Sequence, residues 1–388
     1  MHRQAVAPSS DLPEPVGDLL ELARRSIEII GAHQDPGGAY PASPTFSAYR
    51  GYAWLRDGSF TAEAMSRWGE VASADRFHDW VAGVLLARRH RVGGLVAAAE
   101  RGDRPARHDM LPTRFTLDGE EGSDEWWDFQ TDGYGMWLWA VATHVARHAL
   151  SPERWLPAVG VAVDYLVAFG GDACFDWWEE HDEHQHVSTL AAVYGGLIAA
   201  QRMQTLDDHR REAARSAASG LRRLVLAHGT VGDDANEHLV KWLGTSAVDG
   251  SLPACIVPFG LIEPGTAIAT ATLTAVSGAL EVNGGVHRFA ADVFYGGGQW
   301  PLLSCLLGWN LAVAGDVAGA WRLLRWSAAT AIATGELPEQ VADHLVHPGH
   351  RTEWMDRWGP VATPLLWSHA MFLILADELG LRERLAEA

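Results

Sequence analysis

The segment FDWWEEH, residues 175–181, places two glutamates directly after two tryptophans. Glu179 follows Trp177 and Trp178 and is itself followed by the second carboxylate, Glu180. Burial against aromatic rings and repulsion from a neighbouring carboxylate both raise a carboxyl pKa, so Glu179 is expected to keep a proton that it can donate. The alternative is an exposed acid pair at the start of a helix, where the helix dipole stabilises negatively charged side chains.

Tryptophan is abundant throughout the chain. The sequence has 18 Trp, 7 Tyr and 11 Phe, so half of its aromatic residues are of the largest type. Flat aromatic faces beside acids suit a ligand with apolar C–H faces and hydroxyl edges, which is the description of a sugar. For any single tryptophan, filling a helical core is an equally good interpretation. The tryptophans beside carboxylates in the sequence are Trp54, Trp126, Trp127, Trp177 and Trp178.

Residues that could hold a metal or cofactor form no convincing motif. The histidines of HDEHQH (181–186) and HLVHPGH (344–350) lie close in sequence, but neither segment is an H-E-x-x-H pair, so hydrogen-bonded or solvated histidines are expected. The one lysine, Lys241, has no phosphate-loop or Schiff-base motif around it. The glycines of YGGGQW (295–300) are expected to let the backbone approach a sugar. The sequence therefore predicts no metal and no cofactor.

Composition excludes several classes of partner. Of the 388 residues, 48% are hydrophobic and 20% charged, which is typical of a chain with a large core. The net charge of −19 leaves no diffuse basic surface for nucleic acid or an anionic membrane. No run of 18 apolar residues and no apolar signal segment occurs, which predicts a cytoplasmic protein. Three cysteines without C-x-x-C spacing predict buried thiols.

Helical periodicity, with apolar residues three and four apart, runs through most of the chain. About twelve helices are expected, at residues 17–32, 59–69, 72–90, 131–149, 154–169, 187–204, 207–228, 253–262, 265–282, 298–314, 316–333 and 363–380. Weak strand patterns occur near 91–97 and 111–117. Long segments rich in Gly, Trp and acids separate helix pairs, at 35–58, 101–130, 171–186, 229–252, 283–297 and 334–362.

The arrangement of these elements predicts a single all-α domain. No Ser/Gly or Pro linker divides the chain, so we expect one domain over residues 17–388 after an N-terminal extension, residues 1–16. Connections as long as these are usually functional in compact domains. A ring of paired helices would place the six long segments around a common pocket.

The long segments resemble those of glycoside hydrolase family 15, the glucoamylase family. Each motif is weak alone, but five in the family's order, each at a helix junction, make a chance match improbable. The resemblance implies an (α/α)6 barrel and an inverting, exo-acting α-glucoside hydrolase that uses no cofactor. The segments are YRGYAWLRDGSF (49–60), EWWDFQTDGYG (125–135), FDWWEEH (175–181), HRFAADVFYGGGQW (287–300) and GELPEQV (335–341).

Two glutamates receive catalytic roles from the resemblance. The family's general acid is the first glutamate of its W-E-E segment, which matches Glu179. Its general base is the glutamate of an x-E-Q segment, which matches Glu339, with Glu336 as the competing candidate. Inverting glycosidases hold their two carboxyl groups about 6.5 to 9.5 Å apart, which leaves room for the attacking water.

The resemblance also implies residues at the closed end of a sugar pocket. Arg56 and Asp57 match the Arg-Asp pair that grips the non-reducing glucose, and a closed end of this kind explains exo action. A buried structural ion pair is the alternative. Tyr49 and Tyr52 are both candidates for positioning the water, because the alignment slips by one residue there.

Further sugar-binding residues follow from spacing within the matched motifs. Arg288 and Trp300 keep the twelve-residue spacing of the family's subsite Arg and Trp. Trp126 and Trp178 are expected to line the glucose site, Trp300 the leaving-group site, and Glu180 to complete the substrate-binding set.

The chain has no room for the extra β-sandwich or starch-binding domains found in many relatives, which favours a small substrate. Isomaltose or an isomalto-oligosaccharide is the preferred hypothesis, ahead of maltose, malto-oligosaccharides and trehalose. Two further hypotheses are a glycoside phosphorylase and a non-catalytic sugar-binding protein. Glu339 argues against the phosphorylase, in which phosphate replaces water and base. The paired acids argue against simple binding, because neutral sugars can be bound by amides without desolvated carboxylates.

Overall fold

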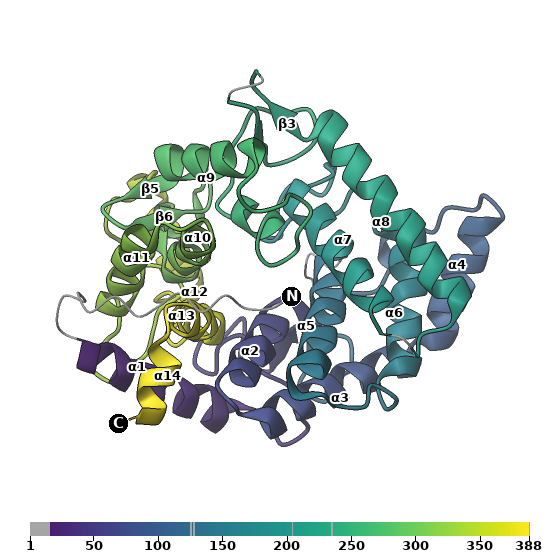
Figure 1. The fold of residues 1–388 in the computed structure, drawn as a ribbon, viewed down its shortest axis with the longest axis horizontal. Coiled ribbons are helices and arrows are strands. Elements are labelled where there is room, and N and C mark those ends of the chain that lie inside the picture. Colours follow the sequence, from purple (N-terminus) through teal and green to yellow (C-terminus); the bar gives the residue numbers. More distant parts are fainter. Residues whose placement is uncertain (1–15, 125, 127–128, 204, 234–235, 388) are drawn as a thin grey trace.

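Two rings of helices, one inside the other, surround a common centre (Figure 1). The structure, a computed structural model, describes residues 16–387 apart from 125, 127–128, 204 and 234–235. The inner helices are α2 (Leu55–Arg67), α5 (Asp132–His148), α7 (Val187–Gln201), α10 (Pro301–Val313) and α13 (Leu366–Glu378). The outer helices are α1 (Val16–His33), α3 (Val71–Ala87), α6 (Leu156–Phe169), α8 (Asp208–His228), α9 (Ala267–Leu280) and α11 (Val317–Ala329). The predicted (α/α)6 barrel is confirmed.

Residue patterns distinguish the two rings. The outer helix α8 buries only Ala214, Ala218, Leu221 and Val225, which lie three and four residues apart on one face. The inner helix α13 buries every residue from Leu366 to Ala376, because it is covered on all sides. Side-chain caps begin several outer helices: the carboxylate of Asp207, for instance, accepts a hydrogen bond from the backbone N–H of Arg210.

Glycine permits the close contact between the inner helices α5 and α7. A Cβ atom on Gly135 would lie 2.4 Å from the carbonyl oxygen of Ala192, and one on Gly196 would lie 2.3 Å from the carbonyl oxygen of Gly135. Both distances are shorter than any real contact, so the two backbones meet where neither residue carries a side chain.

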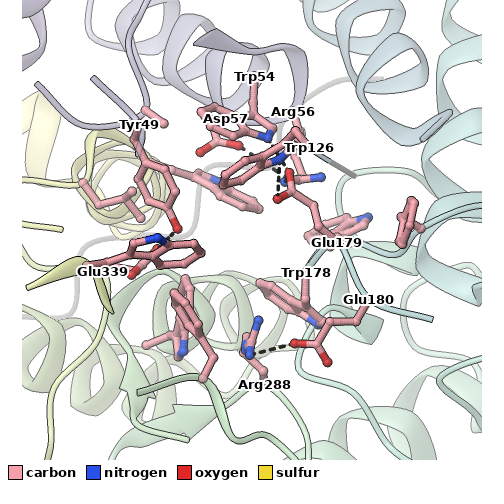
Figure 2. Close-up of a pocket in the computed structure, with 18 of the residues that line it drawn as sticks. Tyr49, Trp54, Arg56, Asp57, Trp126, Trp178, Glu179, Glu180, Arg288 and Glu339 are labelled. Carbon is pink, nitrogen blue, oxygen red and sulfur yellow. Dashed lines mark hydrogen bonds and ion pairs between the residues drawn. The ribbon is translucent and has the colours of Figure 1, made fainter. Parts of the chain in front are cut away.

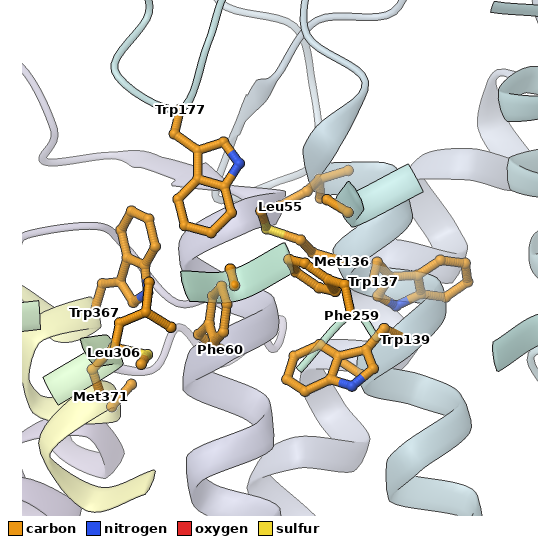
Figure 3. Packing of buried hydrophobic residues seen from close by; sticks show 14 of the residues in the cluster. Leu55, Phe60, Met136, Trp137, Trp139, Trp177, Phe259, Leu306, Trp367 and Met371 are labelled. Atoms are coloured by element: carbon orange, nitrogen blue, oxygen red, sulfur yellow. The ribbon is translucent and has the colours of Figure 1, made fainter. Parts of the chain in front are cut away.

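Aromatic side chains fill the barrel interior (Figure 3). The ring of Phe60, from α2, stacks on Trp367 with centroids 5.7 Å apart and packs against Trp139 at 5.4 Å. Trp177 lies 6.2 Å from Phe60 and 5.8 Å from Trp367. These buried rings form a packed aromatic layer that fills the interior of the barrel.

Short antiparallel strands join some of the long segments. They are β1 (Tyr52–Trp54) with β2 (Arg114–Thr116), β3 (Thr230–Val231) with β4 (His238–Leu239), and β5 (Glu281–Val282), β6 (Gly285–His287) and β7 (Gln299–Trp300) in one sheet. The predicted strand near 111–117 is confirmed by β2. Since β1 runs straight into α2, that helix begins four residues earlier than predicted and carries Arg56 and Asp57 on its first turn.

The described residues contain fourteen α-helices, against about twelve predicted. The predicted helix at 253–262 is only a 3₁₀ turn, Leu252–Cys255, which packs against α7 and α10 in the sixth inner position. Three helices were not predicted: α12 (Arg351–Trp358), α14 (Leu381–Glu387) and α4 (Arg89–Glu100). The remaining 3₁₀ turns are Arg107–Asp109, Phe294–Gly296 and Pro348–His350.

The strand predicted near 91–97 is wrong. These residues belong to α4 (Arg89–Glu100), which follows α3 after a break at Arg88. Val92 and Leu95 are its buried residues, three positions apart as on one helix face. The two glycines between them bear no side chains, so this face was hard to recognise in the sequence.

Three further predictions concern the start of the chain, the cysteines and membrane spans. Residues 1–15 of the predicted extension lie outside the described residues, so the domain boundary at residue 16 stays a prediction. Cys174, Cys255 and Cys305 are free and buried, as predicted. Among the described helices, none has the length and apolar character needed to span a membrane.

Candidate active site

A pocket of about 450 Å³ opens at one end of the barrel, within the size range of small-molecule sites. Five of the six predicted long segments contribute lining residues, and 229–252 does not. Among the residues that the structure describes, eight tryptophans line the pocket, while others, such as Trp137 and Trp155, are core residues. Its lining side chains include Tyr49, Trp54, Arg56, Asp57, Trp126, Trp177, Trp178, Glu179, Glu180, His181, Arg288, Phe294, Trp300, Glu339, Trp354, Trp358 and Trp367.

Glu179 lies between two indole N–H groups (Figure 2). Trp54 Nε1 donates to its Oε1, and Trp126 Nε1 donates to its Oε2 over 2.9 Å. The Arg56 guanidinium lies 3.6 Å from Oε1. Burial raises the pKa of Glu179, and Arg56 and the indole hydrogen bonds only partly oppose it. The direction is the one predicted, and the group is suited to holding a proton.

The turn that carries Glu179 is not a helix start, since α7 begins only at Val187. Oδ1 of Asp176 accepts hydrogen bonds from the backbone N–H groups of Trp178 and Glu180, each over 2.9 Å. Glu179 itself has a φ of +63°. The alternative of an exposed acid pair on the first turn of a helix is therefore wrong.

Glu180 does not face Glu179. Its Oε1 accepts from Nη2 of Arg288 over 3.1 Å (Figure 2). The same guanidinium is ion-paired with Asp292. The guanidinium also lies 5.4 Å from the ring centroids of both Trp178 and Trp300. The expected repulsion between neighbouring glutamates is thus replaced by a Glu180–Arg288 pair at the pocket wall.

Glu339 is 2% exposed and lies on a different side of the pocket from Glu179 (Figure 2). The Tyr49 hydroxyl donates to its Oε1 over 3.0 Å. Among the described residues, no side chain or backbone group is hydrogen-bonded to its Oε2. Burial raises the pKa of Glu339 to about 8, although the Tyr49 hydrogen bond lowers it.

The competing tyrosine and glutamate lie elsewhere. The Tyr52 hydroxyl donates to Asp124 over 2.7 Å. Glu336 accepts from the Thr334 hydroxyl over 2.8 Å and is not among the described residues that line the pocket. The geometry therefore favours Tyr49 over Tyr52 and Glu339 over Glu336.

Arg56 and Asp57 differ in their surroundings. Nη1 of Arg56 donates to Gln130 over 2.6 Å and to Asp132 over 3.1 Å, so this side chain is tied to the start of α5. Asp57 lies beside it, with Oδ2 3.6 Å from Nε, and burial raises the pKa of Asp57 to about 7. Both line the pocket, and Arg56 serves as a structural ion-pair partner at the same time.

Several pocket residues were missed from the sequence. Trp354 and Trp358 lie four residues apart on α12, a spacing that puts them on one helix face. Trp358 stacks on Trp126 with centroids 6.3 Å apart and 20° between the planes. Phe294 packs against Trp354 at 4.9 Å. The i, i+4 tryptophan pair was the available signal, but α12 lies within a segment predicted to be a long loop.

Arg114 was also missed, although it supports the same wall. Its guanidinium lies 3.8 Å from the ring centroid of Tyr52 and 4.0 Å from that of Trp126. Its Nη2 donates to Asp124 over 2.7 Å. The neighbours Glu125, Trp127 and Asp128 in the matched motif lie outside the described residues.

The histidine-rich and glycine-rich segments have other surroundings. His184 stacks on Trp242 with centroids 4.3 Å apart, and among the described residues no group of three potential ligands could hold a metal. The expectation that the glycines of 295–300 approach a sugar is not met. A Cβ atom on Gly297 would meet the carbonyl oxygen of Asp292, and one on Gly298 that of Val341, each at 2.4 Å.

Comparison with known proteins places these features in a family. Residues 18–355 match the profile described as Glycosyl hydrolases family 15. The sequence is 66% identical, over 94% of this chain and 94% of the relative, to the isomaltose glucohydrolase of Kribbella flavida. A solved glycosidase superposes with a TM-score of 0.92 at 65% identity, covering 94% of this chain and 98% of that chain, and an equally similar variant was solved in complex with glucose.

A more distant structure supports the fold alone. A bacterial glucoamylase complexed with acarbose superposes with a TM-score of 0.71 at 21% identity, covering 92% of this chain and 55% of that chain. The nearly full-length profile match, together with 66% identity to an isomaltose glucohydrolase, shows that the chain belongs to Glycosyl hydrolases family 15 and is a glycoside hydrolase.

Proposed function

We propose that this glycoside hydrolase releases β-glucose, with inversion, from the non-reducing end of isomaltose and small isomalto-oligosaccharides. The observation that carries the proposal is the pair of carboxyl groups, the partly buried Glu179 and the buried Glu339, that line one pocket from different sides. The isomaltose glucohydrolase of Kribbella flavida, at 66% identity, supports the choice of substrate. The glucose held by a 65% identical glycosidase variant supports a small sugar as the ligand.

In this mechanism Glu179 is the general acid. Burial raises the pKa of Glu179, which favours its protonated form, and the indoles of Trp54 and Trp126 fix the direction of its carboxyl group. The proton passes to the glycosidic oxygen as the bond from that oxygen to the anomeric carbon breaks. The departing sugar therefore leaves as a neutral alcohol.

Glu339 is the general base. Its Oε2, which no described group engages, is available to take a proton from the attacking water, while Tyr49 holds Oε1. The water adds to the anomeric carbon on the face opposite the leaving group, so an α-glucoside gives β-glucose. The Tyr49 hydroxyl is close enough to this carboxyl group to help position that water.

Asp57 and Arg56 form the binding site for the terminal glucose hydroxyls, with Trp126 and Trp178 beside the ring. Arg288, Glu180 and Trp300 line the site of the leaving sugar. Charged donors next to charged acceptors match vicinal hydroxyls, and aromatic faces match the C–H faces of the ring.

Two further features expected from the sequence stay predictions. They are the cytoplasmic location of the protein and the N-terminal extension at residues 1–16.

The test is the configuration of the first product. Wild-type enzyme is given isomaltose, and the anomer released is followed by NMR before mutarotation. β-Glucose is expected; initial α-glucose would mean retention and would remove the roles given to both glutamates. Parallel reactions with maltose and trehalose rank the substrates, and isomaltose is expected to have the highest kcat/KM.

Adding inorganic phosphate distinguishes hydrolysis from phosphorolysis. The rate of glucose release is expected to be independent of phosphate, and glucose 1-phosphate as the product would contradict the proposal. A protein that binds isomaltose without releasing glucose would support a sugar-binding function instead.

A further inference from the structure

Lys241 is the one lysine of the sequence, and the proposed mechanism does not use it. It is 3% exposed and is not among the described residues that line the pocket. Its Nζ donates to Oδ2 of Asp176 over 2.8 Å and to Oδ2 of Asp249 over 2.5 Å, and it lies 3.9 Å from the ring centroid of Phe289. Burying a cation is costly unless it is well paired, so this bridge needs an explanation.

Asp176 connects Lys241 to the main chain of the turn that carries Glu179. While Oδ2 of Asp176 binds the lysine, Oδ1 accepts the backbone N–H groups of Trp178 and Glu180. The backbone of Asp176 also accepts from the N–H of Glu179 and donates to the carbonyl oxygen of Glu180, each over 3.0 Å. Every residue from 178 to 180 is thus hydrogen-bonded to Asp176.

Asp249 connects the same lysine to a pocket wall. Both of its carboxyl oxygens lie 3.1 Å from Nε1 of Trp178, which donates to them. Its Oδ1 also accepts from the hydroxyl and the backbone N–H of Ser251. Lys241 therefore holds two carboxylates, one of which fixes the turn and the other the indole beside it.

The turn needs such support because its backbone is strained. Glu179 has a φ of +63° and His181 a φ of +56°, a region that residues other than glycine seldom occupy. Conformations of this kind persist only when the surrounding contacts fix them. Burial alone would raise the pKa of Asp176, but Lys241 holds it below its usual range, so the hydrogen-bond acceptor of the turn stays charged.

We propose that Lys241 is a positioning residue for the catalytic acid: by bridging Asp176 and Asp249 it holds the turn of residues 176–180, and hence the Glu179 carboxyl group, in its reactive orientation. The proposal rests on the proposed role of Glu179 as the general acid. Without the ammonium group, two buried carboxylates lose their shared partner, and the turn loses the anchor that its strained backbone requires.

The test compares two substrates of Lys241→Met in the full chain. Isomaltose has a poor leaving group that needs a proton from Glu179, whereas fluoride leaves α-glucosyl fluoride with little need for one. For a misplaced acid, we expect kcat on isomaltose to fall roughly 10- to 100-fold and kcat on the fluoride by less than roughly threefold. A loss of correctly folded enzyme would lower both rates by the same factor, and that result would overturn the proposal.

Arg67→Met is the matched control. Arg67 is also a buried cation bridging carboxylates, with Glu63 at 2.7 Å, Asp377 at 3.1 Å and Glu378 at 3.3 Å. It lies at the other end of α2, roughly 15 Å from the pocket end. We expect its loss to lower the melting temperature and to leave the ratio of isomaltose to fluoride rates at the wild-type value. If the ratio of isomaltose to fluoride rates changed in this variant, that ratio would depend on protein stability and not on the position of Glu179. That result would overturn the proposal.

The double variant Lys241→Met/Asp249→Asn guards against a failure to fold, because it removes one positive and one negative charge together. We expect it to be folded and to retain the selective loss of activity on isomaltose. A wild-type ratio of isomaltose to fluoride rates would overturn the proposal.

Glu179→Gln separates the acid role of Glu179 from the positioning role of Lys241. If it slows both substrates equally, the acid assignment fails; if it is selective and the lysine variants are not, only the role of Lys241 fails.

Discussion

The hydroxyl of Tyr49 donates a hydrogen bond to Oε1 of Glu339 over 3.0 Å, although the two residues are 290 positions apart in sequence. The carboxyl group is buried, and its other oxygen has no partner among the described residues. A buried acceptor without a partner costs stability, which a bound water or substrate would recover. The pair therefore gives the proposed base one fixed oxygen and one available oxygen.

Tyr49→Phe is expected to lower activity most at low pH. The hydrogen bond from Tyr49 favours the charged form of Glu339, whose pKa is already raised to about 8 by burial. Removing the hydroxyl raises that pKa further, so the base is deprotonated only at higher pH and the acidic limb of the kcat/KM profile moves upward. We expect a loss of roughly tenfold at neutral pH. An unchanged acidic limb would mean that Tyr49 does not act on Glu339.

Glu339→Ala and Glu336→Ala form a matched pair three residues apart. The first removes the proposed base and is expected to lower kcat by at least roughly 100-fold on isomaltose and on α-glucosyl fluoride alike. The second removes a glutamate that is not among the pocket-lining residues, and kinetics close to wild type are expected. Azide added to Glu339→Ala should restore some turnover on the fluoride and give β-glucosyl azide. If the two variants behaved in the reverse manner, the assignment of the base would be wrong.

Glu179→Gln should discriminate between leaving groups. The amide cannot donate a proton as an acid does, so kcat on isomaltose is expected to fall by roughly 100-fold or more while kcat on α-glucosyl fluoride changes little. The control is Glu183→Gln, an exposed glutamate four residues further along, for which wild-type rates on both substrates are expected. Equal losses on both substrates would contradict the role of Glu179 as the acid.

Asp57→Ala tests whether the Arg56–Asp57 pair binds sugar or only stabilises the fold. Hydrogen bonds to a charged group contribute about 1.5 to 3 kcal/mol each, so losing one from the terminal glucose is expected to lower kcat/KM by at least roughly tenfold. Arg56 keeps Gln130 and Asp132, so we expect the melting temperature to change little. Normal kinetics with a lowered melting temperature would instead identify a structural ion pair.

Periodicity predicted the rings of helices because most of their buried residues recur at helical spacing, as in α8. It failed at α4, where two glycines interrupt the pattern, and at α12, which buries none of its residues and resembles a loop. The matched motifs predicted that Glu179, Glu339 and their neighbours share one pocket, and these residues line one pocket in the structure. It could not predict that Glu180 turns to Arg288, since that depends on a backbone with positive φ at Glu179. Nor could it predict that Gln130 and Asp132, more than 70 residues away, hold Arg56.

The burial of Lys241 also determines how the folded protein meets amine-reactive reagents. Acylating esters attack amines that are both exposed and unprotonated, and Lys241 is neither. Burial alone would lower its pKa, but Asp176 and Asp249 hold that pKa above its usual range. Because the sequence has no other lysine, acylation of a lysine side chain can occur only when this part of the chain opens. The rate at which Lys241 gains the mass of one acyl group would therefore measure how often the structure opens locally around the turn of residues 176–180.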